Sequence, residues 1–348
     1  MSQIHRVDVL IIGAGPAGIS ALAECVYHDV GSIMVLEKGP THNQTIHKYY
    51  PDHKRVDAAY KGQEAICAGV LCFRDTTKPN FIYTIDKLLE LYPAPIVYNC
   101  HVESIKKQTD GSFMTTDSSG NLYQSFYVIV TIGRMGKPNK PDYFKDIPTS
   151  IRSLLKFDIC NLIPQGQEVL VVGGGNSAIE YVLSLAGDGA KVTVSYRKPD
   201  FSRLNPMNQE LLFKDEADGK IKILRQSNIS TITEDKGRPK VHFQEKQFKP
   251  MIFDLVIFGI GGSSPAGFLQ NAGLELDAKG NPILNEWHES SQTNLFVGGE
   301  LSVAPGKGSI IVSFNSGKLI VEAIMKKMGK KRKPEIVTLH YHYVPESK

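Results

Sequence analysis

Short apolar runs that end at glycine-rich turns dominate the hydrophobic pattern of this 348-residue chain. The first run, Val7–Ile12, leads into Gly13-Ala-Gly-Pro-Ala-Gly18, and apolar residues then recur with helical spacing over Ile19–Val26. This order predicts a buried strand, a tight turn and a helix. The next apolar run, Ser32–Leu36, predicts a second strand, which ends at Glu37.

The same succession recurs in the middle of the chain. Glu168–Val172 predicts a strand and Gly173-Gly-Gly-Asn-Ser-Ala178 a glycine turn. A helix through Leu185 and a strand over Lys191–Ser195 follow. Two strand–turn–helix–strand units in one chain are typical of an α/β protein with two parallel sheets.

Each glycine turn has the spacing that a bound pyrophosphate requires. In the first turn, Gly13 makes the tight bend, Gly15 lets a pyrophosphate approach the backbone, and Gly18 lets the helix pack closely on the strand. The free N–H groups and the positive dipole end of the helix would then bind the phosphates. Glu37 stands where an acid accepts a hydrogen bond from a ribose 2′-hydroxyl. The alternative is a plain glycine turn that binds no ligand.

The two units differ at one equivalent position. The interval from Gly13 to Glu37 equals the interval from Gly173 to Arg197, and Lys198 and Arg203 follow Arg197. A carboxylate would repel a 2′-phosphate, whereas guanidinium groups bind one bidentately. We therefore expect NADPH at the second turn and an unphosphorylated adenosine at the first, unless the basic residues only form a solvated loop. Two dinucleotides indicate a nicotinamide reductant and a bound flavin.

The composition mainly excludes classes of protein and of site. A 41% hydrophobic content and a net charge of +4 are typical of a globular protein and do not suggest nucleic acid. Without an apolar run of membrane-spanning length or a secretory segment, we expect no membrane partner and a cytoplasmic location. The odd set Cys25, Cys67, Cys72, Cys100 and Cys160 contains no C-x-x-C, which argues against a disulfide scaffold, a metal site and a thioredoxin-like dithiol.

Two glycine-containing segments predict domain crossings. Tyr127–Gly133 reads as a strand and gives way to the proline-containing connector Arg134–Pro141. The pattern returns at Asp254–Gly262, followed by Ser263–Pro265. The chain is expected to leave one domain at the first connector and to return to it at the second.

The series GAGPAG, Glu37, TIG, GGGNSA, YRK, FGIGG and VGGE resembles the thioredoxin-reductase-like flavoproteins in order and spacing, over nearly the whole chain. The resemblance implies an α/β fold with two Rossmann-like, three-layer ββα dinucleotide-binding domains. The NADPH-binding domain, residues 135–263, would be inserted into an FAD-binding domain formed by residues 1–134 and 264–330. Residues 331–348 would form a C-terminal tail, and the protein would be a homodimer.

The resemblance also assigns cofactor-binding residues. No side chain is expected to act as a nucleophile, because the flavin carries the chemistry. Where the family usually has Gly-Asp, this chain has Gly299-Glu300, whose side chain is one methylene longer but still delivers a carboxylate toward the ribityl hydroxyls. The expected FAD contacts are Gly13, Gly15, Pro16, Ala17, Gly18, Glu37, Lys38, Gln44, Tyr50 (stacked on the flavin), Asp57, Val102, Thr131, Gly133, Gly299, Glu300, Ser309 and Ile310. The expected NADPH contacts are Gly173, Gly175, Asn176, Ser177, Ala178, Arg197, Lys198, Arg203 and Gly261.

The cysteines distinguish between members of the family. Thioredoxin reductases carry C-x-x-C ahead of the second turn, where this chain has only Cys160. Bacillithiol-disulfide reductases have a cysteine in the first turn, where Ala17 stands here. The chain looks most similar to the ferredoxin- or flavodoxin-NADP reductases of thioredoxin-reductase type, which would pass electrons from NADPH through FAD to ferredoxin, flavodoxin or a quinone-like acceptor without a redox-active dithiol. A low-molecular-weight (bacillithiol-type) disulfide reductase, a flavin monooxygenase and a redox-responsive binding module remain alternatives.

Two features near the C-terminus complete the sequence interpretation. The basic run Lys326–Lys333 is either a solvated helix cap or a docking patch for an acidic electron carrier. The alternating segment Ile336–Val344 is either an edge strand or an extension that places one of its aromatic or histidine residues over the flavin.

Overall fold

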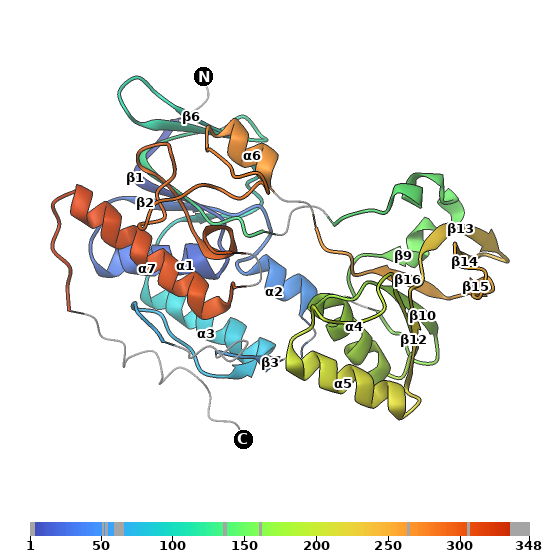
Figure 1. Ribbon diagram of the computed structural model, residues 1–348. Helices are drawn as coiled ribbons and strands as arrows, with labels where there is room; N and C mark the ends of the chain where they lie inside the picture. The colour runs from blue at the N-terminus through green and yellow to red at the C-terminus, as the bar shows by residue number, and fades with distance from the viewer. Residues whose placement is uncertain are drawn as a thin grey trace. The chain divides into compact units, whose positions relative to one another are not determined.

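The computed structural model describes residues 4–50, 52, 55–58, 66–134, 138–159, 162–262, 265–304 and 307–334. The chain divides into two compact units (Figure 1). The split unit comprises Met1–Arg134 and Ser264–Lys348, and the inserted unit comprises Met135–Ser263. Cys160 and the segment Ile336–Val344 lie outside the described residues.

A parallel core of strands with an antiparallel extension forms the sheet of the split unit. In the order β5-β2-β1-β8-β7-β6, β1 pairs in parallel with both β2 and β8, and β17 adds to β8 in parallel. The strands are β5 (Ile96–Val97), β2 (Ile33–Leu36), β1 (Ile4–Ile12), β8 (Leu122–Val130), β7 (Phe113–Asp117), β6 (Val102–Lys107) and β17 (Leu295–Val297). A separate hairpin pairs β3 (Arg55–Val56) with β4 (Thr76–Thr77).

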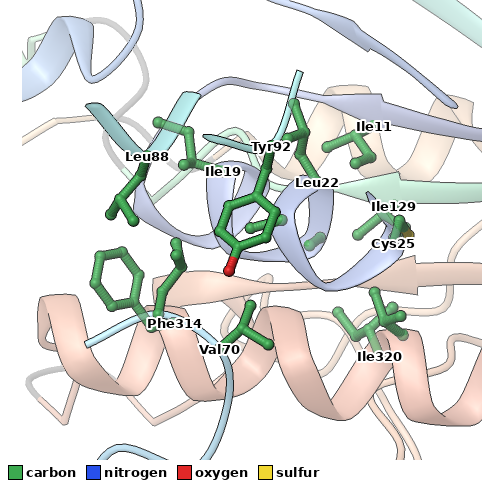
Figure 2. Packing of buried hydrophobic residues seen from close by; sticks show 14 of the residues in the cluster. Ile11, Ile19, Leu22, Cys25, Val70, Leu88, Tyr92, Ile129, Phe314 and Ile320 are labelled. Carbon is green, nitrogen blue, oxygen red and sulfur yellow. The ribbon is translucent and has the colours of Figure 1, made fainter. Parts of the chain in front are cut away.

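Both faces of this sheet are buried, which explains why β1 is apolar at successive positions. Val9 and Ile11 belong to one core cluster, whereas Leu10 and Ile12 belong to another. The first cluster gathers side chains of β1, α1 (Pro16–Tyr27), α3 (Lys78–Leu91) and α7 (Ile310–Lys327) (Figure 2). The short helices α2 (Gln44–Tyr49) and α6 (Ala266–Asn271) and the 3-10 turn η3 (Gly299–Ser302) complete the unit.

The close packing of α1 on α7 depends on Gly317. A Cβ atom at this position would lie 2.7 Å from both the Ala17 carbonyl oxygen and the Ala21 nitrogen. Since the nearest atoms belong to the α1 backbone, they cannot rotate away as a side chain could. The two helices therefore meet backbone to backbone.

The inserted unit contains a second parallel sheet, in the order β12-β11-β10-β16-β9. Its strands are β12 (Ile221–Arg225), β11 (Lys191–Tyr196), β10 (Glu168–Val172), β16 (Leu255–Phe258) and β9 (Leu155–Lys156). The helices α4 (Asn176–Gly187) and α5 (Pro206–Ala217), the antiparallel strands β13 (Ile229–Asp235), β14 (Arg238–Phe243) and β15 (Met251–Ile252), and the 3-10 turns η1 (Asp142–Asp146) and η2 (Thr149–Leu154) surround it. The predicted α/β class is confirmed.

Nowhere in the described part of the chain does a helix combine the length and the apolar character that a membrane crossing requires.

We predict that Gly317→Ala destabilises the split unit by about 1–3 kcal/mol, because the new methyl group would overlap the backbone of α1. Gly187→Ala is the matched control, since a Cβ atom there has nothing within 4 Å. Denaturant unfolding followed by circular dichroism measures both changes. Equal midpoints for Gly317→Ala and the wild type would show that α1 and α7 are not packed this closely.

Candidate functional site

The first glycine turn joins β1 to α1 and leaves open space at its centre. A Cβ atom on Gly13, whose φ is +105°, would lie 2.7 Å from the Thr131 carbonyl oxygen, and one on Gly18 would lie 1.9 Å from the Gly13 carbonyl oxygen. A Cβ atom on Gly15 would have nothing within 4 Å. The turn is therefore closed against side chains on the protein side and open where a pyrophosphate would approach.

The start of α1 presents backbone amides to this opening. Gly15 precedes the helix, makes no side-chain capping bond, and is followed by Pro16, which has no N–H group to satisfy. The amides of Ala17 and Gly18 then lie in the first turn, at the positive end of the helix dipole. The residues of this turn fit a phosphate-bearing ligand.

Glu37, at the end of β2, is held against the turn. Its Oε2 atom accepts a hydrogen bond of 2.7 Å from the Ala14 amide, and its Oε1 atom accepts one of 2.6 Å from the Gly39 amide. Each carboxylate oxygen has a second lone pair, which a ribose hydroxyl can use. Lys38, the neighbouring residue, is exposed, and no hydrogen bond of its side chain to the turn is observed among the described residues.

The ends of β8 and β17 lie beside the same turn. Thr131 Oγ1 lies 3.0 Å and 2.8 Å from the carbonyl oxygens of Ile12 and Gly13, respectively. A Cβ atom on Gly299 would lie 3.2 Å from Ala17 Cβ, which places Gly299 against α1. Gly133 has a φ of +68° and open space around its Cβ position. The structure thus brings these predicted residues together around the start of α1.

The beginning of α7 is formed by Ser309 and Ile310. Ser309 Oγ accepts a hydrogen bond of 3.1 Å from the Val312 amide and so caps the helix. Glu300, which is exposed, lies near Gly308, because a Cβ atom on Gly308 would be 2.8 Å from Glu300 Cγ. The exposed carboxylate and the capped helix start therefore lie on neighbouring segments.

Arg134, which the sequence analysis did not select, fixes the segment that contains Glu300. Its Nη2 atom donates hydrogen bonds of 2.8 Å to the carbonyl oxygens of both Glu300 and Val303, and Nη1 donates to Asn281. The two carbonyl contacts form only in the folded chain. The spacing of residues near Arg134 in the sequence therefore could not predict these two hydrogen bonds.

Buried polar atoms without partners lie on and beside α2. Gln44 Oε1, which was expected from the sequence, and Asn43 Oδ1 and His47 Nε2, which were not, are buried and have no hydrogen-bond partner among the residues that the structure describes. The Asn43 amide donates 2.8 Å to the Ala14 carbonyl oxygen, which places these groups beside the first turn. Burial lowers the pKa of His47. Since buried polar atoms are usually satisfied, such orphans fit a site that a polar ligand completes.

The remaining predicted FAD residues lie in different surroundings. Tyr50 packs against the core cluster of α1 and α7. Val102 starts β6 close to Glu37, since the Cys100 amide donates 2.8 Å to the Glu37 carbonyl oxygen. Asp57 instead forms an ion pair with Arg55.

The second turn, between β10 and α4, repeats the features of the first. A Cβ atom on Gly173 (φ +139°) would lie 2.3 Å from the Gly259 carbonyl oxygen, whereas one on Gly175 would have nothing within 4 Å. Ala178 takes the place of the third glycine and packs against Gly259. Gly261, with a φ of +81°, follows two residues later.

Side chains at the start of α4 have distinct roles. Asn176 Oδ1 accepts hydrogen bonds from the Asn205 amide (2.9 Å) and from Asn208 Nδ2 (3.1 Å), so it ties the turn to α5. Ser177 is exposed in the first helical turn. Both residues therefore lie at the open side of the glycine turn.

The predicted basic residues follow β11. Because β10 and β11 are parallel neighbours, and the Gly173 amide donates 2.9 Å to the Ser195 carbonyl oxygen, Arg197 emerges at the same sheet edge as the turn. Arg197, Lys198 and Arg203 are exposed. Across the described ranges their side chains make no ion pair, which leaves their charges available to an anionic ligand.

The structure corrects the expectation drawn from the cysteines. Cys67 and Cys72 form a disulfide with a Cα–Cα distance of 5.5 Å. The sequence analysis considered only C-x-x-C spacing and missed this C-x4-C pair, whose intervening loop brings both sulfurs together. Cys25 and Cys100 are free and buried; burial raises the pKa of both thiols, that of Cys100 to about 11.

The basic run near the C-terminus folds back onto acidic groups. Lys327 pairs with Glu289, Arg332 with Glu322 and Lys333 with Asp29. Lys326 lies 5.4 Å from the centre of the Trp287 ring. These contacts favour the helix-cap interpretation over a free docking patch.

Comparisons with known proteins agree with this arrangement. The model of the pyridine nucleotide-disulphide oxidoreductase family matches residues 10–299. A ferredoxin-NADP reductase of Nitrobacter hamburgensis is 25% identical, over 92% of this chain and 91% of its own. In fold, the chain is similar to the bacillithiol disulfide reductase of Bacillus cereus (TM-score 0.78, 22% identity, 93% of this chain and 100% of that one). It is also similar to the thioredoxin reductase of Lactococcus lactis (TM-score 0.73, 21% identity, 92% and 98%).

The resemblance to thioredoxin-reductase-like flavoproteins is therefore confirmed, together with the two Rossmann-like domains that it implied. The family match spans most of the chain and includes both glycine turns. The chain belongs to the pyridine nucleotide-disulphide oxidoreductase family and is an NAD(P)H-dependent flavoprotein oxidoreductase with FAD and NADPH as its cofactors.

Proposed function

We propose that this enzyme passes electrons from NADPH through FAD to a ferredoxin or flavodoxin, with FAD in the split unit and NADPH in the inserted unit. The observation that carries the proposal is the pair of open glycine turns with opposite charges beside them. Glu37 is anchored next to the first turn, and Arg197 lies free next to the second. We also expect a homodimer in the cytoplasm.

In the split unit, the residues around the first turn would bind and orient FAD. The amides of Ala17 and Gly18 bind the pyrophosphate, and Glu37 accepts a hydrogen bond from the ribose. The buried orphans Gln44 Oε1 and His47 Nε2 gain partners from the bound group. When bound, FAD accepts a hydride from NADPH and releases its electrons to the acceptor. The N-terminus of α7, capped by Ser309, would present its positive dipole end to negative charge on the bound group.

In the inserted unit, discrimination between NADPH and NADH rests on side chains that leave the sheet edge. Arg197, Lys198 and Arg203 are exposed cations with no competing ion pair in the described ranges. A 2′-phosphate would gain charge-assisted hydrogen bonds from them, and NADH offers no such group. The preference for NADPH over NADH therefore depends on these three side chains and not on the glycine turn.

The disulfide supports a second candidate, a disulfide reductase. Its acceptor would be a low-molecular-weight or protein disulfide instead of an electron carrier. The Cys67–Cys72 bond favours this candidate because a flavoenzyme of this family could use such a pair to exchange electrons with thiols.

We predict that Gly15→Val yields a folded protein that does not retain FAD. The added side chain points into open space, so it obstructs the ligand and not the protein. Gly267→Val is the matched control, because a Cβ atom there also has nothing within 4 Å. Flavin absorbance of the purified proteins, with circular dichroism for folding, gives the result. A yellow Gly15→Val protein with normal FAD content would remove the first turn from the site.

We predict that Arg197→Glu lowers kcat/KM for NADPH by about 10- to 150-fold, the equivalent of about 1.5–3 kcal/mol for a hydrogen bond to a charged group. The value for NADH should change much less. Lys191→Glu, at the opposite end of β11, carries the same type of charge reversal and should leave the NADPH:NADH ratio unchanged. Steady-state kinetics with NADPH and with NADH measures kcat/KM for both coenzymes in each variant. An unaltered ratio in Arg197→Glu would exclude this residue from the 2′-phosphate site.

The acceptor is tested by anaerobic stopped-flow of the holoenzyme. NADPH should reduce the flavin faster than NADH does, and the reduced enzyme should then be reoxidised by flavodoxin or ferredoxin. Because these carriers are acidic and the chain has a net charge of +4, added salt should slow their reduction but not that of a neutral quinone. Rapid flavin reduction with no reoxidation by either carrier would exclude the carrier assignment.

A further inference from the structure

Asn43 has an unusual conformation for the residue that precedes a helix. Its φ of 47° and ψ of 35° lie in the left-handed region, and its side chain makes no capping hydrogen bond with α2. An asparagine at this position normally accepts a hydrogen bond from an amide of the first helical turn. Because Asn43 is 1% exposed, its side chain needs other partners inside the protein.

One of these partners is the neighbouring imidazole. Asn43 Nδ2 lies 3.0 Å from His42 Nδ1, and His42 Nε2 lies 2.8 Å from Asp86 Oδ1. His42 is 4% exposed, whereas the Asp86 side chain is 53% exposed. The three residues, here called the Asp86–His42–Asn43 chain, therefore connect a buried amide to a carboxylate that solvent can reach.

The direction of each hydrogen bond follows from the carboxylate end of the chain. An ionised Asp86 carboxylate only accepts, so His42 Nε2 carries a hydrogen atom. In the neutral imidazole Nδ1 is then an acceptor, which takes a hydrogen bond from Asn43 Nδ2. This contact orients the amide and leaves Asn43 Oδ1 for a different partner. The Oδ1 atom is buried and has no such partner among the residues that the structure describes.

Asn43 is fixed to the first glycine turn. Its amide donates a hydrogen bond of 2.8 Å to the Ala14 carbonyl oxygen, and the Ala14 amide donates one to Glu37 Oε2. Gln44 Oε1, the other buried acceptor without a partner, lies 3.0 Å from where a Cβ atom on Gly39 would be. Two neighbouring residues thus offer unused acceptors beside the turn that is proposed to bind FAD. The hydroxyl groups of FAD are donors that can satisfy them.

We propose that Asp86 and His42 are positioning residues for FAD, because they orient the Asn43 amide so that its Oδ1 atom accepts a hydrogen bond from an FAD hydroxyl group. Protonation of His42 at Nδ1 reverses the amide and weakens FAD binding. The proposal rests on the binding of FAD in the split unit, which is part of the proposed function, and adds to it a dependence on pH.

The nitrogen that faces Asn43 is the atom that changes. Imidazole side chains take up a proton between about pH 8 and pH 5, and with Nε2–H bonded to Asp86 the added proton goes to Nδ1. Nδ1–H then attracts Asn43 Oδ1, and the turned amide presents Nδ2 to the ligand. A hydroxyl group can accept from Nδ2, but its own hydrogen atom then lacks the acceptor that Oδ1 supplied. A buried donor without a partner costs free energy.

Other titratable groups surround the imidazole. The His47 ring centre lies 5.7 Å from that of His42, and burial lowers the pKa of His47. Burial raises the pKa of Tyr98, which is hydrogen-bonded to the His42 backbone. The groups that face His42 or these two neighbours are Asp86 and Lys78 of α3, His47 of α2, Tyr98 and Glu37.

The sign of the change separates the amide reversal from a plain effect of charge. A positive charge added near a pyrophosphate attracts it, so protonation by itself would strengthen FAD binding as the pH falls. Reversal of the amide has the opposite effect, because it removes an acceptor from the ligand. We therefore expect the affinity for FAD to fall on acidification.

The first test measures the dissociation constant of FAD from the full-length holoenzyme by ultrafiltration and fluorescence of the released FAD. Between about pH 8 and pH 5 the Kd should rise by about 5- to 150-fold, the range for one buried hydrogen-bonding group left without a partner. Asn43→Gly removes the amide but suits the left-handed backbone, so it should bind FAD weakly throughout, with little change with pH. Circular dichroism at each pH confirms that the proteins stay folded.

Asp86→Asn tests the carboxylate. An amide at this position can donate to Nε2 as well as accept from it, so the hydrogen atom of the neutral imidazole is no longer held away from Nδ1. The Kd should then rise at the alkaline end of the range, and its change with pH should become smaller. Glu90→Gln is the matched control, because it removes an exposed carboxylate from the same helix, where Glu90 pairs with Lys87. It should keep the wild-type Kd and pH profile.

The two imidazoles are separated by single substitutions. His42→Gln should abolish the rise in Kd on acidification, whereas His47→Gln should keep it, whatever its own effect on affinity. The opposite result, or a wild-type Kd that stays constant or falls toward acidic pH, would refute the positioning role while FAD binding in the split unit stands. If the wild-type protein binds no FAD at any pH, the proposed function fails together with this proposal.

Discussion

The arrangement of the split unit depends on a junction where four elements, β1, β8, α1 and α7, approach one another closely at glycine residues. Gly13 lies against the carbonyl of Thr131, Gly18 against that of Gly13, and Gly317 against the backbone of α1. Because backbone atoms contact backbone atoms at these positions, van der Waals contact of the backbones limits the distances between β1, β8, α1 and α7. The amides at the start of α1 and the capped start of α7 are consequently parts of one rigid frame.

The inserted unit meets the same constraint with different partners. Gly173 lies against the Gly259 carbonyl, and Gly259 lies against Ala178. The two units therefore differ less in backbone than in the residue that follows the second strand. Glu37 is 8% exposed and already bound to two amides, whereas Arg197 is exposed and unconstrained by any ion pair in the described ranges. The shared backbone geometry would bind a pyrophosphate at both turns. Glu37 and Arg197 would then determine which dinucleotide, FAD or NADPH, binds at each turn.

The parts of the structure that sequence could predict are those set by neighbouring residues. The strand, glycine turn and helix at Val7–Val26 and again at Glu168–Leu185 are local patterns, and the α/β class follows from their repetition. The contacts of Arg134, and the hydrogen bonds that join Asn315 to the backbone of Ile66 and Ala68, connect segments far apart in the chain, so no local sequence pattern predicts them. The assignment of single residues to FAD or NADPH stays a prediction. The Cys67–Cys72 disulfide differs from these contacts, because the two cysteines are only five residues apart. The sequence analysis missed the pair because it considered only C-x-x-C spacing.

Glu24 and Asn315 hold the loop that contains Cys67 and Cys72 by hydrogen bonds to its backbone. A buried carboxylate costs free energy unless hydrogen bonds compensate, and Glu24, which is 1% exposed, accepts one from the Val70 amide. Asn315, which is partly exposed, bonds to the backbone of Ile66 and Ala68. These hydrogen bonds join the loop backbone to α1 and α7, so they hold the loop against both helices independently of the S–S bond that closes it.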